Sequence, residues 1–408
     1  MLLVKNIGYL ITFNGLYWSD MGVVKDAAML IDDEFVFWLG STSEVLETKV
    51  SRVFNAGGNV VIPGLIDCHT HLIFAGNRAN EFAMRARGES YLNIMNIGGG
   101  ILNTMRAVRK ASKQELIDLA LPRLEKMLKF GVTTIEAKSG YGLNLNDELK
   151  MLDALVTLRK NQPIDIEVTF LGAHTIPPEY IGNKKKYVSD IIHQILPGIV
   201  KHNTVKFCDI FIEKNAFNVE DAAIILGRAK SLGLECKVHA EQLTHQGGAS
   251  LAAKIGAISV SHLEFINDAD VKVIAQKDVV AEILPISYEY LGGTQLPPTK
   301  DLMIAGAKIC VASDFNPGSA MCNDIQLALR LAVVRNGLTC EQALLGATKN
   351  AAYSLKRNDI GQIKVGTKAD FCVLNTNNLW EFFSDWTKNT VSTVFKNGLI
   401  VHSLINEN

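Results

Sequence analysis

Eight short apolar runs, each followed by a stretch with helical periodicity, constrain the fold of this chain more than any other feature. Such regular alternation is typical of βα units that surround a parallel sheet. Eight units in a row predict a closed α/β structure of the (β/α)8 barrel type. The expected strands are residues 60–71, 133–140, 166–175, 207–213, 235–241, 257–263, 279–285 and 308–315.

The segments between these runs have the pattern of helices. In residues 113–131 apolar side chains recur every three or four positions, and Gly131 is placed where it can end the helix. Residues 218–233 repeat the pattern. We expect these helices to form the outer layer of the barrel.

The two ends of the chain differ from its middle. Residues 1–58 are typical of short strands, with turns at Asn14-Gly15 and Gly57-Gly58, and residues 359–375 and 391–403 have the same character. We expect the two ends to pair in one small β-sandwich domain. The predicted division is therefore 1–58 and 355–408 for this domain and 59–354 for the barrel, which suits a chain of 408 residues.

Composition narrows the partners and the compartment. The charges nearly cancel, at a formal net of -1, so there is no electrostatic reason to expect nucleic acid or an anionic membrane as a partner, and a small-molecule ligand fits better. Seven cysteines scattered through apolar runs look like the reduced thiols of a cytoplasmic protein. The first residues lack a cleavage site, and no later run reaches membrane-spanning length.

Reactive side chains stand at the ends of the predicted strands. In a barrel the chemistry lies at the carboxyl ends of the strands, so groups that end different strands meet at one rim. Such groups are found on seven of the eight strands: His69, His71, Lys138, His174, Glu213, His239, His262 and Asp314.

Four of these groups predict a metal site. His69 and His71 are two residues apart on a strand, so both imidazoles point to the same face and can share one divalent ion. An isolated His-x-His pair is weak evidence, but His239 is a natural third ligand on the same rim and Asp314 a fourth. Three imidazoles and one carboxylate, with a water in the open position, are typical of a hydrolytic site. The absence of cysteine from this set favours zinc or iron.

Two rim residues are candidates for proton transfer. Asp314, beside a metal-bound water, can take its proton and later deliver it to a leaving nitrogen. The alternative is a cap for the turn Asp-Phe-Asn-Pro-Gly, and the position at a strand end favours catalysis. His262 is placed to relay protons or to polarise a carbonyl, with a buried structural histidine as the alternative.

Polar groups near the predicted rim suit an acidic, planar substrate. They are Arg78, Tyr91, Tyr141 and Gln242. An arginine such as Arg78 can clamp a carboxylate through two hydrogen bonds, which a lysine does less selectively. The alternative for Arg78 is a surface salt bridge with Glu81, three residues on.

Together these motifs resemble the amidohydrolase superfamily, and within it the imidazolonepropionase family, over nearly the whole chain. The resemblance implies metal ligation by His69, His71, His239 and Asp314, with one zinc or iron ion. The motifs that carry it are PGLIDCHTHLIFAGNRANEF, GGGI, GVTTIEAKSGYGL, TFLGAHTIPPEY, HAEQ, SHLE and SDFNPGS. The implied substrate contacts are Arg78, Tyr91, Tyr141, His174 and Gln242, while Asn316, Gly318 and Ser319 would line the pocket of the ring-opened product.

The resemblance also implies a reaction and an assembly. The reaction is hydrolysis of 4-imidazolone-5-propanoate to N-formimidoyl-L-glutamate in histidine degradation. A hydroxide held by the metal attacks the ring carbonyl, Asp314 and His262 transfer protons, and the lactam carbon–nitrogen bond breaks. The family resemblance further suggests a homodimer.

Two other readings compete with this one. The first is another amidohydrolase, either a deaminase, which Gln242 in place of a glutamate disfavours, or a two-metal cyclic amidase such as a hydantoinase or dihydroorotase. The cyclic amidases use a carboxylated lysine, and the strand-end lysine here, Lys138, has another explanation in its KSGYG motif. The second reading is a barrel that serves only as a structural or interaction module, which the retention of all four predicted ligands disfavours.

Overall fold

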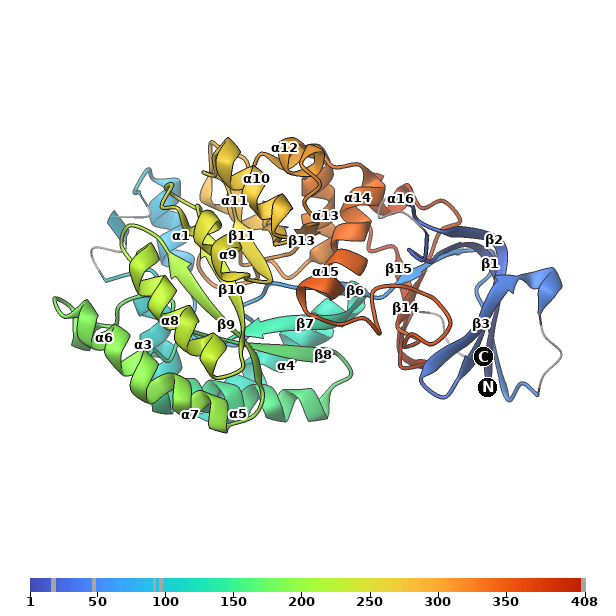
Figure 1. Ribbon diagram of the computed structural model, residues 1–408. Helices are drawn as coiled ribbons and strands as arrows, with labels where there is room; N and C mark the ends of the chain where they lie inside the picture. The colour runs from blue at the N-terminus through green and yellow to red at the C-terminus, as the bar shows by residue number, and fades with distance from the viewer. Residues whose placement is uncertain (16–19, 46–48, 91–92, 95–97, 405–408) are drawn as a thin grey trace.

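The fold comprises a barrel and a separate sheet formed by the two ends of the chain (Figure 1). A computed structural model describes residues 1–15, 20–45, 49–90, 93–94 and 98–404. In Figure 1 the barrel occupies the left and centre, and the terminal sheet lies at the right with both chain ends.

The barrel contains the eight expected strands, side by side in chain order and parallel. Their side chains are almost all buried, as expected when a barrel interior and an outer helical layer cover both faces. The (β/α)8 prediction is confirmed. The strands are β6 (Leu65–Asp67), β7 (Val132–Lys138), β8 (Asp165–Ala173), β9 (Val205–Ile212), β10 (Glu235–Ala240), β11 (Ser259–His262), β12 (Val280–Ile283) and β13 (Ile309–Val311).

The barrel closes just beyond the ends of its first and last strands. The backbone N–H of His71 donates to Phe315 at 2.9 Å, and that of Asp314 donates to His69 at 3.1 Å. One step earlier, Asp67 accepts a hydrogen bond of 3.0 Å from the backbone N–H of Ser313. Closure therefore brings two candidate metal-binding segments, far apart in the sequence, into register.

Helices surround the barrel, as their periodicity predicted. Ser112 and Glu115 form a capping box that starts α4, with hydrogen bonds of 3.2 and 2.7 Å. Gly131 follows the end of α4 with a φ of +91°, a conformation that favours glycine. The helices between the strands are α1 (Ala79–Ala86), α3 (Ile101–Lys110), α4 (Lys113–Lys129), α5 (Leu145–Asn161), α6 (Lys184–Asp190), the π-helical turn η3 (Ile191–Ile195), α7 (Leu196–Lys201), α8 (Val219–Ser231), α9 (Gly248–Ile255), α10 (Asp268–Gln276), α11 (Pro285–Leu291) and α12 (Thr299–Ile304).

The chain returns from the barrel to the terminal sheet through three more helices: α13 (Ile325–Val334), α14 (Cys340–Gly346) and α15 (Lys349–Ser354). A short helix, α16 (Glu381–Ser384), lies between β14 and β15, and two short 3-10 turns are η1 (Thr42–Glu44) and η2 (Pro178–Tyr180). None of the described helices has both the length and the apolar character needed to cross a lipid bilayer.

The terminal sheet joins strands from both ends of the chain. Its hydrogen-bonded order is β16-β15-β14-β5-β1-β2-β3, with β4 added alongside β1. The expected pairing of the two ends is thus confirmed. Its strands are β1 (Leu2–Ile11), β2 (Val23–Asp32), β3 (Phe35–Ser41), β4 (Arg52–Asn55), β5 (Val60–Pro63), β14 (Phe371–Leu374), β15 (Val391–Lys396) and β16 (Leu399–Ser403).

The sheet encloses a hydrophobic core of its own. Val4, Met29 and Val61 belong to this core. In it the rings of Phe371 and Phe395 stack with their centroids 4.2 Å apart.

The prediction of a single strand over residues 60–71 was wrong in extent. This segment forms two short strands that belong to different sheets. β5 pairs with β1 and β14 in the terminal sheet, whereas β6 pairs with β7 in the barrel. Gly64 lies between them, and a Cβ at this position would be 2.3 Å from the side-chain oxygen of Thr133. Gly64, which packs closely against Thr133, is therefore the point at which the chain passes from one sheet to the other. The apolar pattern had merged the two strands on either side of it. Within residues 359–375, where short strands and turns were expected, β14 forms.

Candidate active site and metal centre

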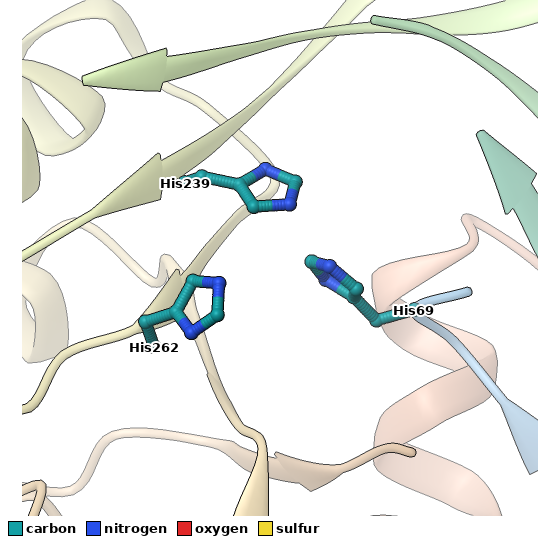
Figure 2. A group of neighbouring side chains, drawn as sticks. All are labelled: His69, His239 and His262. Carbon is teal, nitrogen blue, oxygen red and sulfur yellow. The ribbon is translucent and has the colours of Figure 1, made fainter. Parts of the chain in front are cut away.

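Three histidines from three strand ends face one another inside the barrel rim. Figure 2 shows the rings of His69, His239 and His262 turned toward a common space. The ring centroids of His69 and His239 are 4.5 Å apart, and those of His239 and His262 are 5.4 Å apart. One ring nitrogen from each of the three lies within 4.8 Å of the others, a spacing that suits one shared metal ion.

A second group shares His69 with the first. The Nε2 atoms of His69 and His71 each lie 3.5 Å from the same carboxylate oxygen of Asp314. These three residues also meet the geometric criterion for holding an ion. The four predicted ligands, His69, His71, His239 and Asp314, thus lie together at the rim.

The buried atoms of this cluster fit a divalent cation. The Nε2 atoms of His69 and His239 are buried and have no hydrogen-bond partner among the described residues. Buried polar atoms are nearly always paired, so a cluster of unpaired nitrogens beside a carboxylate is the arrangement that a metal ion completes.

The protonation state of the histidines also fits metal binding. Burial, reinforced by the positive charge of Lys138, lowers the pKa of His69 well below its ordinary value, and burial together with His239 does the same for the pKa of His71. Burial also lowers the pKa of His262 to about 3. These imidazoles are therefore neutral at pH 7, which is the form that binds metals or accepts protons.

Buried carboxylates orient two of the histidines from behind. The Nδ1 of His69 lies 3.0 Å from Ser261 Oγ and 3.2 Å from Glu282, which leaves Nε2 facing Asp314. Asp209 lies 2.9 Å from the Nδ1 of His239. Carboxylates in this position fix the tautomer and the ring orientation of ligating histidines. Sequence reasoning missed both carboxylates, although each is a charged residue inside an otherwise apolar strand run.

Lysines neutralise these carboxylates in the barrel interior. Lys138 lies 2.8 Å from both Glu136 and Asp209, and Lys237 lies 3.0 Å from Glu282. Burial by itself lowers the pKa of Lys138, but Asp209 and Glu136 raise it above the ordinary value overall. The strand-end lysine noted in the sequence is thus a charged ammonium held between two carboxylates.

A cavity opens above the cluster, and we call it the catalytic cavity. His71, His239, His262 and Asp314 line it. Ile101 and Phe211, whose apolar side chains gave no chemical signal in the sequence, also contribute. Six of the predicted substrate-binding residues line this cavity: Arg78, Tyr141, His174, Gln242, Asn316 and Ser319. Two predicted contacts remain: Gly318 is not among the lining residues, and Tyr91 lies outside the described residues.

Arg78 lines the catalytic cavity, and Glu81 fixes its guanidinium by a salt bridge. Its Nε donates to Glu81 at 2.7 Å, and both residues are buried. The salt bridge considered as an alternative is therefore present, but it is internal. A Cβ at Gly318 would lie 1.8 Å from an Nη atom of Arg78, so the guanidinium packs against the bare backbone of this glycine. That contact explains why a residue without a side chain is needed at position 318.

The KSGYG motif shapes the wall that carries Tyr141 and His174. The carboxylate of Glu148 accepts hydrogen bonds from the backbone N–H groups of Gly140 and Gly142, at 3.1 and 2.8 Å. Gly140 has a φ of +105°, and a Cβ there would meet the carbonyl oxygen of Leu171 at 2.5 Å. The carbonyl of Gly140 accepts from His174 Nδ1 at 3.1 Å, which directs the other ring nitrogen toward the cavity.

The turn after β13 is closed by Asn316. Its Oδ1 accepts from the backbone N–H groups of Gly318 and Ser319, both at 2.8 Å, and its Nδ2 donates to the Asp314 carbonyl at 2.6 Å. The carboxylate of Asp314 takes no part in these hydrogen bonds and faces the histidines. The capping role considered for Asp314 thus belongs to Asn316.

Glu213 stands behind the cavity. It accepts from the backbone N–H groups of Leu243 and Thr244, at 3.0 and 3.2 Å. Its role is therefore to fix the loop that follows Gln242.

Comparison with known proteins agrees with the geometry. The amidohydrolase family profile matches residues 60–401. The chain belongs to the amidohydrolase family. Within it the chain is a member of the imidazolonepropionases, since it is 43% identical to the imidazolonepropionase of Shewanella frigidimarina (strain NCIMB 400) over 383 residues, 93% of each chain. It is also 44% identical to that of Shewanella putrefaciens (strain CN-32 / ATCC BAA-453) over 384 residues, which cover 93% of this chain and 94% of the relative.

Solved structures share the fold at low sequence identity. A zinc complex of atrazine chlorohydrolase from Arthrobacter aurescens TC1 matches with a TM-score of 0.75 at 17% identity, and the match covers 99% of this chain and 95% of the other. An adenosine deaminase from Xanthomonas campestris with bound zinc has a TM-score of 0.69 at 16% identity, over 100% and 94% of the two chains. The protein is therefore a metal-dependent hydrolase of small molecules.

Proposed function

We propose that this protein hydrolyses the lactam carbon–nitrogen bond of 4-imidazolone-5-propanoate to give N-formimidoyl-L-glutamate, a step in the breakdown of L-histidine to glutamate. The observation that carries the proposal is the 43–44% identity to imidazolonepropionases over 93% of the chain. A ring of candidate metal ligands and a buried arginine in one cavity are consistent with hydrolysis of an anionic substrate.

His69, His71, His239 and Asp314 would hold one zinc or iron ion. The buried, unpaired Nε2 atoms and the shared carboxylate support this set. When bound, the ion lowers the pKa of a water molecule toward neutrality and polarises a carbonyl.

Asp314 and His262 would move the protons. Asp314 is placed to accept the proton of the attacking water and to deliver it to the leaving ring nitrogen. Burial lowers the pKa of His262 to about 3, so its ring is neutral at pH 7 and would have a nitrogen free to accept a hydrogen bond or a proton. Both residues line the same cavity, which supports a shared role.

The remaining cavity residues would bind the substrate. Arg78 suits the propanoate carboxylate, because a guanidinium donates two parallel hydrogen bonds to it. Tyr141, His174 and Gln242 would contact the ring, and a glutamine amide serves here as a hydrogen-bonding group because it does not readily transfer protons. Asn316, Gly318 and Ser319 would line the side on which the ring-opened product lies, and Tyr91 completes the proposed set.

We further propose a cytoplasmic homodimer and a two-domain chain. The seven cysteines are free thiols, which supports a reducing compartment. The separate hydrophobic core of the terminal sheet supports the division into 1–58 and 355–408 on one side and 59–354 on the other, although β5 (Val60–Pro63) pairs in the terminal sheet. Sedimentation of the purified protein tests the dimer.

Loss of imidazolone absorbance with purified protein tests the activity directly. We expect turnover that a chelator abolishes and that zinc or iron, added back separately, restores. Metal content measured on the same samples assigns the ion. Absence of turnover in metal-loaded protein would overturn the substrate assignment, while chelator-resistant turnover would overturn the metal requirement.

A further inference from the structure

A second cavity lies beside the catalytic cavity, and we call it the side cavity. Gln242 lines both. The side cavity has a volume of about 340 Å³, whereas the catalytic cavity has about 40 Å³. Ligand sites usually measure about 300–1,000 Å³, so the catalytic cavity alone is small for an extended product, and the side cavity offers the adjoining space.

One buried carboxyl group on the side cavity lacks a partner. Glu264 lines this cavity and is only 4% exposed. Its Oε2 has no hydrogen-bond partner within the described chain, and its Oε1 lies 3.9 Å from the Nδ1 of His262. Because buried polar atoms are nearly always paired, this oxygen is placed for a donor that arrives with a ligand.

The backbone holds Glu264 at this boundary. His262 and the next residue, Leu263, both have positive φ angles, +81° and +74°, which side-chain-bearing residues rarely adopt. The turn is fastened to the end of β10, since the N–H of Leu263 donates to Ala240 at 3.2 Å and that of Phe265 donates to Glu241 at 2.9 Å. Glu264 is therefore fixed beside the strand end that carries Gln242.

The reaction creates a group that matches this carboxyl. Cleavage of the lactam bond leaves the carbonyl carbon as a carboxylate and turns the ring N–C–N unit into a free N–CH=NH amidine. An amidine and a carboxyl group share two parallel hydrogen bonds whichever of them holds the proton, in the same fork geometry as an arginine–carboxylate pair. In the closed ring the bonding directions of the two nitrogens diverge, so the ring cannot present this pair of parallel contacts.

From this arrangement we propose that Glu264 and the side cavity form a subsite for the formimidoyl group that ring opening releases. The inference rests on the proposed function. Arg85, which also lines the side cavity, lies over the rings of Phe82 and Tyr290, at 5.6 and 5.0 Å. Glu264 would thus distinguish the product from the substrate.

Binding of two product-like ligands tests the subsite without turnover. N-formimidoyl-L-glutamate and N-formyl-L-glutamate differ only in the exchange of an NH for an oxygen, so calorimetric titration of the metal-loaded protein with each isolates the amidine contact. We expect the wild type to prefer the formimidoyl ligand by about tenfold or more, since charge-assisted pairs are among the stronger hydrogen bonds. The preference should vanish in Glu264→Gln and persist in the control Glu89→Gln, which alters an exposed carboxylate on the same cavity.

The kinetic readout separates product recognition from a structural role. In Glu264→Gln the inhibition constant of the product should rise about tenfold while KM for the imidazolone changes less than about threefold. An unchanged product preference, or equal increases in both constants, would overturn the subsite. If Glu264→Gln does not fold, the wild-type preference between the two ligands still decides, because equal affinity contradicts the proposal. Absence of imidazolone turnover would instead contradict the proposed function.

Discussion

A cavity beside the terminal sheet is much larger than the catalytic cavity but lacks its cluster of histidines. The first, which we call the terminal cavity, has a volume of about 620 Å³ and includes Lys25, Asp26 and Trp380 in its walls, against about 40 Å³ for the catalytic cavity. Yet four histidines with unpaired buried ring nitrogens, His69, His71, His239 and His262, cluster at the smaller one, whereas the terminal sheet has such a nitrogen only singly, on His402, among the described residues. Volume therefore does not identify the reactive region, whereas a cluster of unpaired buried nitrogens does.

The largest effect should come from the carboxylate of the catalytic cavity. Asp314→Asn keeps the shape of the side chain but removes its basicity, so kcat/KM should fall about 10²- to 10⁴-fold. Steady-state kinetics on protein of measured metal content provides the check. Asp26→Asn in the terminal cavity is a matched control, since both aspartates have positive φ angles, +53° and +46°, and it should alter kcat/KM less than twofold. Full activity of metal-loaded Asp314→Asn would refute the proton-transfer role.

A substitution in the core of the terminal sheet should lower the stability of the protein without changing its catalytic rate. Phe395→Ala removes one of two stacked rings from the terminal core and should lower the free energy of unfolding by about 3–5 kcal/mol. Denaturant titration measures this loss, and assays well below the unfolding transition should give an unchanged kcat. A large fall in kcat at full folding would show that the two regions are coupled and that the contrast between them is wrong.

The position of Arg78 should depend on a glycine. Gly318→Ala places a methyl group where the guanidinium now lies, so KM for the imidazolone should rise about tenfold with a smaller change in kcat, because a carboxylate contact is lost in the ground state. Gly227→Ala in α8, where a Cβ meets no atom within 4 Å, is the control and should leave both constants unchanged. Equal kinetics for the two variants would remove Arg78 from the substrate site.

The smallest expected effect is on stability, and it comes from His245, a histidine outside the catalytic cavity that is hydrogen-bonded to a carboxylate. His245 Nε2 lies 2.8 Å from Asp270, and this hydrogen bond raises its pKa above the ordinary value. A raised folded-state pKa stabilises the protein below the unfolded pKa of about 6.5 and loses that contribution as the pH rises through the folded pKa. The side chain is 44% exposed, so the gain should stay below about 1 kcal/mol. Urea unfolding of wild type and His245→Gln at pH 5.5 and 8.5 should show a difference only at the lower pH, and an equal difference at both would exclude the pairing as its cause.

Sequence patterns predicted the parts of the fold that repeat. Eight strands and the rim histidines follow from local periodicity and from the rule that parallel strands end at one edge. The break at Gly64 was not predictable, because it depends on a contact with Thr133 on another strand.

The supporting contacts of the site were equally hidden. Glu282 stands 213 residues from His69 in the chain, and no local pattern connects them. The unpaired carboxyl of Glu264 likewise becomes visible only when the surrounding residues are in place.

The adjacency of β5 and β6 has a consequence for the order in which the protein can be built. Only Gly64 separates β5 from the strand that leads to His69, and β5 pairs on one side with β14, through Phe371 and Pro63. During synthesis β5 has only its N-terminal neighbour until residues 371–374 leave the ribosome. The strand that precedes the metal-binding segment therefore gains its second neighbour only after about 300 further residues have been made, and contacts of such long range slow folding.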